Sequence, residues 1–146
     1  MKFKIAIINS SYYRNVSKDL INGALVSLKK HSKYFKIKEI SVPGAFEIPF
    51  EISRNIESYD AFIALGCIIK GKTPHFDFIS GAITNSLMQL SIQNKKPISN
   101  GVITCLNMKQ ALERSNIRKK NKGGEAAKAI IALLKILRRT DYDIAI

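Results

Sequence analysis

Short apolar runs rich in β-branched residues alternate with amphipathic stretches along this chain. Four runs have the length and composition of buried strands: residues 4–8, 37–42, 61–69 and 98–105. The third run is apolar at nearly every position, which predicts a central strand. Apolar residues recur at helical spacing over 16–28 and 76–90, and further helices are expected at 108–114 and about 125–138. Alternating strands and helices predict an α/β fold with a four-stranded parallel sheet and helices on both faces.

The length of 146 residues predicts a single domain spanning 1–146, because a chain of this size buries a core without staples. Cys67 and Cys105 lie in separate apolar runs without metal-ligand spacing, so we expect no metal site and reduced thiols in a cytoplasmic protein. Lys2 and Lys4 lead directly into the first strand, which predicts no secretion signal. No apolar run approaches the ~20 residues of a membrane helix, so no membrane partner is expected.

The net charge of +13, from 24 Lys and Arg against 11 Asp and Glu, raises the question of nucleic-acid binding. The cations are scattered, however, and the densest run, residues 118–122, is short and lacks interleaved aromatic side chains for base stacking. We therefore favour a solvated, lysine-rich surface and expect no nucleic-acid partner. The same charge can attract a small anionic ligand.

Three loops are expected to line one ligand pocket. In open parallel sheets, ligands bind beyond the carboxyl ends of the strands, near the switch in strand order. The loops that follow the first three predicted strands contain residues 10–12, 43–47 and 70–75. These loops therefore hold the first candidates for a binding site.

Residues 66–73, GCIIKGKT, satisfy the P-loop pattern G-x-x-x-x-G-K-[ST] of nucleotide triphosphatases. Their context argues against that interpretation. Residues 67–69 belong to a predicted strand, and neither the first nor the fourth strand runs into the aspartate that holds magnesium in such enzymes. Pro74 also disfavours helical geometry at Thr73, where a P-loop threonine already lies in the helix. We therefore reject a P-loop.

A second interpretation makes the same segment a small phosphate-binding turn. Gly71 permits a tight turn, the backbone N–H groups of Lys72 and Thr73 can face an anion, and Pro74 suits the first position of a helix. His75 would stand beside the phosphate, where imidazole can take and give protons near neutral pH. Taken alone, a histidine without a role in the first turn of a helix is the simpler alternative.

Four segments resemble the lumazine synthase family in their order and spacing. They are VPGAFEIP at 42–49, G-x-T-x-HFD at 71–77, QALER at 110–114 and NKGGEAA at 121–127, so the resemblance covers nearly the whole chain. It implies a flavodoxin-like three-layer αβα sandwich. It also implies a transferase of riboflavin biosynthesis that works without a metal or an organic cofactor. Such an enzyme condenses 5-amino-6-(D-ribitylamino)uracil with 3,4-dihydroxy-2-butanone 4-phosphate to 6,7-dimethyl-8-ribityllumazine, phosphate and water.

The resemblance also assigns roles to particular positions. His75 matches the residue that transfers protons, and the butanone phosphate is assigned to Lys72, Thr73 and Arg114. An arginine fork suits phosphate, although an exposed cation near a helix end needs no such role. The positions that receive the ribitylaminouracil are Tyr12, Ala45, Phe46, Glu47, Cys67, Ile68, Ile69 and Asn100, of which Phe46 alone would more often be a core residue. Lys122 matches a basic residue near the site, and Asp77 or Glu125 could orient His75.

Two positions depart from the family. Asn100 stands where many relatives carry a phenylalanine that covers the pyrimidine, so a hydrogen bond can replace packing on that face of the ring. Lys72 stands where relatives often have a small residue, and this substitution also creates the apparent P-loop. The extra cation makes the field around a bound phosphate more positive.

The resemblance further implies a homopentamer in which a neighbouring subunit supplies Asn100, Arg114 and Lys122 to each site. A decamer, a shell of sixty subunits and association with riboflavin synthase are further forms that the family suggests. Only four residues precede Ile5, and residues 115–120 lack the glycines common in shell-forming relatives. These features favour an isolated pentamer or a pair of pentamers.

Overall fold

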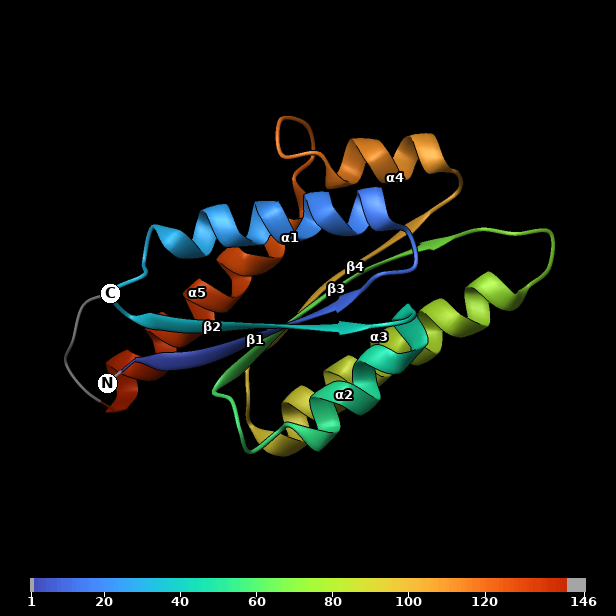
Figure 1. The fold of residues 1–146 in the computed structure, drawn as a ribbon. Coiled ribbons are helices and arrows are strands. Elements are labelled where there is room, and N and C mark those ends of the chain that lie inside the picture. Colours follow the sequence, from blue (N-terminus) through green and yellow to red (C-terminus); the bar gives the residue numbers. More distant parts are fainter. Residues whose placement is uncertain (1, 142–146) are drawn as a thin grey trace.

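The computed structural model describes residues 2–141. Its centre is a four-stranded parallel sheet in the order β2-β1-β3-β4, made of β1 (Phe3–Ser10), β2 (Phe35–Val42), β3 (Ala61–Ile69) and β4 (Ile98–Cys105). β3 lies inside the sheet, as its apolar sequence predicts. Helices cover both faces (Figure 1), which confirms the predicted three-layer α/β fold. Within residues 2–141, no helix combines the length and the apolar character needed to cross a membrane.

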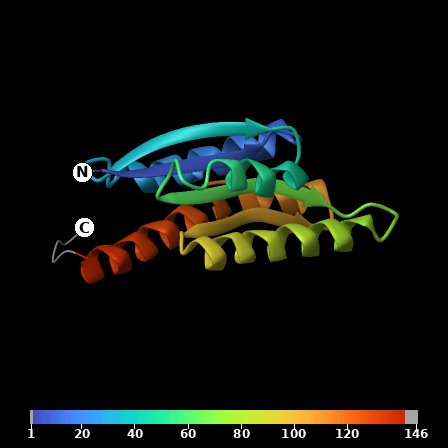
Figure 2. The ribbon, with the colours of Figure 1, turned by 90° about the horizontal axis from the view of Figure 1, so that it is seen from below.

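Side chains of the strands alternate between two cores. Ile5 and Ile7 of β1 face the layer of α1 (Arg14–Lys29), α4 (Met108–Ser115) and α5 (Lys122–Asp141). Ala6 and Ile8 face the layer of the short helix η1 (Ala45–Glu47), α2 (Ile48–Arg54) and α3 (His75–Asn94). Seen from below, α2 and α3 lie on the near side of the sheet (Figure 2). Both faces of the inner strands are covered, which accounts for the apolar sequence of β3 and of β1 from Ile5 to Ile8.

The sequence did not predict α2. This helix has only seven residues, a proline in its first turn and three buried side chains, which are too few to establish a helical period. The predicted helix at about 125–138 also begins earlier in the structure, since α5 starts at Lys122. Gly123 and Gly124 lie in its first turn, and glycine is a poor helix former by propensity alone.

The apparent P-loop lies half within a strand. Residues 66–69 belong to β3, as predicted. The N-cap residue of α3 is Pro74, with φ −69° and ψ 2°, and the helix begins at His75. The expectation that Pro74 would be the first helical residue is therefore wrong by one position, because its ψ has not yet reached the helical range. His75 still lies in the first turn.

The start of α5 lies very close to α1. A Cβ at Gly123 would overlap the backbone carbonyl of Leu20, so only glycine permits this approach. Asn121, just before the helix, has a positive φ of 46°, and its Oδ1 accepts a hydrogen bond from the N–H of Gly124 at 3.2 Å. These contacts determine where Lys122 lies relative to the sheet.

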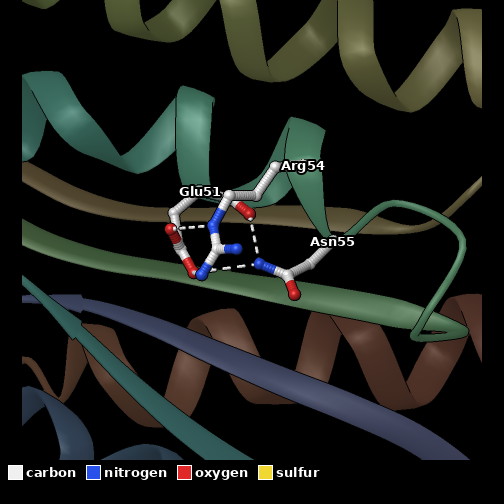
Figure 3. A network of polar contacts seen from close by, with 3 residues as sticks. All are labelled: Glu51, Arg54 and Asn55. Carbon is white, nitrogen blue, oxygen red and sulfur yellow. Dashed lines mark hydrogen bonds and ion pairs between the residues drawn. The ribbon is translucent and has the colours of Figure 1, made fainter.

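Glu51, Arg54 and Asn55 form a polar network at the C-terminal end of α2 (Figure 3). Arg54 donates from Nε to Glu51 Oε2 at 2.8 Å and from Nη2 to Glu51 Oε1 at 3.0 Å. Asn55 donates from Nδ2 to Glu51 Oε1 at 2.9 Å and to the Glu51 carbonyl at 2.8 Å. The hydrogen bonds from Arg54 lower the pKa of the Glu51 carboxyl, although its burial acts in the opposite direction. Glu51 is thus held as a carboxylate.

Glu51→Gln is expected to lower the melting temperature at neutral pH by about 2–4 °C. Because the folded-state pKa of Glu51 lies below its unfolded value of about 4.3, its carboxylate stabilises the fold above that value. This stabilisation disappears as the pH falls through the lowered folded value, so Glu51→Gln should lose less stability on acidification than the native chain. Thermal unfolding across this pH range measures the effect. Glu57→Gln, at an exposed glutamate of the next loop, should behave like the native chain, and identical profiles for all three proteins would contradict the expectation.

Candidate active site

 The first cavity opens at the carboxyl ends of β1, β2 and β3, where the strand order reverses between β1 and β3. Its volume is about 510 Å³. All three loops that follow these strands line the first cavity, as the sequence predicts. The predicted site residues on its wall are Tyr12, Ala45, Phe46, Glu47, Cys67, Ile68, Ile69, Thr73 and His75.

Two exposed aromatic side chains stand at the first cavity. Tyr12 is 72% exposed and Phe46 is 63% exposed, so Phe46 is not a core residue. Exposed rings of this kind can stack on a flat heterocycle. Tyr13 also lines the cavity, and its ring meets Tyr12 edge-on with centroids 4.9 Å apart. Sequence reasoning missed Tyr13, for which its place beside Tyr12 was the available signal.

Buried polar contacts hold the loop after β1 in place. Asn9 contacts Ser17 Oγ through both amide atoms, at 2.7 Å from Nδ2 and 2.9 Å from Oδ1, which ties the end of β1 to α1. The backbone N–H of Ser11 donates to the Val42 carbonyl at 3.0 Å, which ties the same loop to the end of β2. Hydrogen bonds to α1 and β2 therefore fix the position of the loop that carries Tyr12 at the end of β1.

The turn after β3 brings Thr73 and His75 to the cavity. The N–H of Lys70 donates to the Cys105 carbonyl at 2.9 Å, and the N–H of His75 contacts Thr73 Oγ1 at 3.4 Å. The N-terminus of the 20-residue helix α3 lies here, and its dipole favours an anion. Lys72 is exposed and lies outside the cavity wall, so its assignment to the phosphate stays a prediction.

Cys67 shapes the wall without being reactive. It is 7% exposed, and burial, together with the neighbouring Cys105, raises the pKa of its thiol to about 12. Both cysteines are free thiols. A thiol that stays protonated at neutral pH is a poor nucleophile, so Cys67 contributes packing at this position.

A second cavity, of about 770 Å³, follows the outer edge of β4 between α3 and α5. The predicted site residues on its wall are Asn100, Arg114, Lys122 and Glu125. The two cavities share no lining residue. One chain therefore divides the predicted site residues between two separate places.

Neighbouring groups orient Arg114 in the second cavity. Its Nη1 donates to the Thr104 carbonyl at 2.6 Å and lies 3.7 Å from Cys105 Sγ, so Nε and Nη2 of the fork can serve a ligand. α4 carries Arg114 in its last turn. This helix begins with a cap in which Asn107 Oδ1 accepts from the N–H of Gln110 at 2.9 Å, while Gln110 Oε1 accepts from the N–H that precedes the cap.

Asn100 presents one end of its amide to the second cavity. Its Oδ1 accepts a hydrogen bond from the N–H of Val102 at 3.0 Å. This bond identifies the oxygen end of the amide, which leaves Nδ2 as the donor for a ligand. Asn100 thus supplies a hydrogen-bonding group to the wall of this cavity.

The two carboxylates suggested as partners of His75 lie in different places. Glu125 pairs with Lys122 in the second cavity, with Oε2 and Nζ 3.0 Å apart. Asp77 is exposed in the first turn of α3, outside the wall of the first cavity. A role for either carboxylate in orienting His75 stays a prediction.

Comparison with known proteins agrees with the motifs. The family model described as 6,7-dimethyl-8-ribityllumazine synthase matches residues 2–138. The chain belongs to this family. The lumazine synthase of Aliarcobacter butzleri is 40% identical over 136 residues, which cover 91% of this chain and 87% of the relative. That of Methylorubrum populi is 36% identical over 147 residues, which cover 96% and 86%.

Proposed function

We propose that this chain condenses 5-amino-6-(D-ribitylamino)uracil with 3,4-dihydroxy-2-butanone 4-phosphate to 6,7-dimethyl-8-ribityllumazine, as its family name indicates. The observation that carries the proposal is the composition of the first cavity. Aromatic side chains suited to a flat pyrimidine share one wall with Thr73 and His75 at the N-terminus of α3, where a phosphate is favoured. Membership of the family supports the same reaction.

The chemistry needs positioning and proton transfer. An amine attacks a ketone, phosphate leaves, and ring closure expels water, so protons move between nitrogen and oxygen at each stage. Holding both substrates together lowers the barrier through proximity. In this proposal His75 takes and returns the protons, while Thr73 and the backbone N–H groups before α3 bind the phosphate. No step calls for a metal or an organic cofactor.

We further propose that each site forms between two copies of the chain, with the first cavity of one facing the second cavity of the next in a ring of five. The division of the predicted residues between two cavities supports this arrangement. Phe78, Met88 and Ile92 share one face of α3 and are 72%, 61% and 67% exposed, which favours burial of that face in an assembly. Pairs of pentamers, shells and association with riboflavin synthase would extend this ring. The buried free thiols support a cytoplasmic location.

A substrate-mixing experiment tests the reaction. The purified chain, both substrates and a metal chelator are expected to give the lumazine chromophore, measured by absorbance and by the mass of the product. A thermally unfolded sample gives the uncatalysed rate. No product above that rate at any protein concentration would exclude the enzyme, and binding of ribityl compounds without turnover would identify a binding module instead. Native mass spectrometry gives the number of subunits.

A further inference from the structure

Lys120 lies on the wall of the second cavity together with Arg114 and Lys122. Neither the motifs nor the proposed function assigns it a role. It belongs to the turn between α4 and α5, inside a run of cations that sequence analysis treats as a solvated surface (Figure 1). Its place on the cavity wall distinguishes it from Arg118 and Lys119, its neighbours in that run.

Hydrogen bonds fix the backbone of this turn. Asn116 Oδ1 accepts from the N–H of Arg118 at 2.8 Å, and the Asn116 carbonyl accepts from the N–H groups of Lys119 and Asn121, both at 3.0 Å. The N–H of Lys120 donates to the Glu113 carbonyl at 3.2 Å. This last bond holds the backbone of residue 120 against the residue that precedes Arg114, and both cations line the same cavity.

The charges on the cavity wall favour an anion. Three cationic side chains, Arg114, Lys120 and Lys122, stand against one carboxylate, Glu125. Because Glu125 pairs with Lys122 at 3.0 Å, that pair is close to neutral and the excess charge lies on Arg114 and Lys120. A phosphate monoester carries a charge of about −1.5 to −2 at neutral pH, which two cations match better than one.

We propose that Lys120 is a specificity-determining residue that binds the phosphate of the phosphorylated ketone together with Arg114. This inference rests on the proposed function of the site. Lys120 raises the affinity for the phosphorylated substrate and leaves the pyrimidine unaffected. It also raises the affinity for inorganic phosphate, the product, which competes for the same place.

Kinetics of Lys120→Ala at low ionic strength test the proposal. We expect KM for the butanone phosphate and the inhibition constant of inorganic phosphate to rise together by about three- to tenfold, with a smaller difference at high salt. The kcat and the KM for the pyrimidine should stay within about twofold of the native values, because Lys120 is assigned to the phosphate alone. Lys120→Arg should restore most of the affinity.

Lys119→Ala is the matched control, because it removes the same charge from the same turn at a residue outside the cavity wall. It should leave both constants unchanged. Equal effects of the two variants would overturn the proposal in favour of a general field, and no effect of Lys120→Ala would overturn it outright. Calorimetric titration of inorganic phosphate without substrates tests Lys120 separately from catalysis. If only Lys120→Ala binds phosphate more weakly and the native chain forms no lumazine, the anion site at Lys120 stands and the proposed reaction is rejected.

Discussion

His75→Ala is expected to lower kcat by about 100-fold and to change the affinity for either substrate by less than about threefold. The imidazole lies on the wall of the first cavity at the start of α3, where it can exchange protons with the reacting amine and oxygen atoms. The remaining rate comes from holding the two substrates together, which the variant still does. Steady-state kinetics separate kcat from KM, and direct titration measures binding of the pyrimidine.

The second histidine provides the control for this variant. His31 lies in the turn between α1 and β2, where its ring packs near Phe35 with centroids 6.0 Å apart. His31→Ala should therefore leave kcat unchanged. A native kcat in His75→Ala would remove this histidine from the chemistry and leave positioning as the main contribution of the protein.

Much of the fold could be predicted because two patterns in the sequence are clear: short apolar runs mark the strands, and apolar residues at helical spacing mark the longer helices. The bounds of β3 and β4 agree with the prediction at both ends. The apolar run of β3 lies between the charged residues Asp60 and Lys70, and Pro97 directly precedes β4. The short α2 has no such signal, because its buried side chains span little more than one turn. The start of α5 at Lys122 depends on the close approach of Gly123 to the backbone of Leu20, which no local rule can anticipate.

The sequence could predict which residues belong to the site but not how those residues are arranged in space. The resemblance assigned both Glu47 and Arg114 to one site and expected a neighbouring subunit to supply Arg114, whereas the linings of the two cavities show where each residue lies within one chain. Lys119 and Lys120 are equivalent in a charged run, and the backbone of the turn places only Lys120 on a cavity wall. Side-chain direction in loops depends on individual dihedral angles, such as the positive φ of Asn121, that sequence patterns do not determine.

Co-assembly of two weakened variants is expected to restore activity. Arg114→Ala removes a phosphate-binding fork from the second cavity and should lower kcat/KM by about 10- to 100-fold. His75→Ala removes the proton-transfer group from the first cavity. In a ring in which each site combines the first cavity of one copy with the second cavity of the next, mixed rings contain some sites with both side chains intact. Neither variant can form such a site alone.

Random assembly of equal amounts gives an intact first cavity in half of the copies and an intact neighbouring second cavity in half, so about a quarter of the sites are complete. Activity of co-expressed rings should therefore approach about a quarter of the native value. Co-assembly of His75→Ala with the His75→Ala, Arg114→Ala double variant is the matched control, because His75 is then absent from every site. If one chain held the whole site, no mixture would exceed the sum of its parts. Recovery would show that the β4 edge of one copy meets the first cavity of its neighbour.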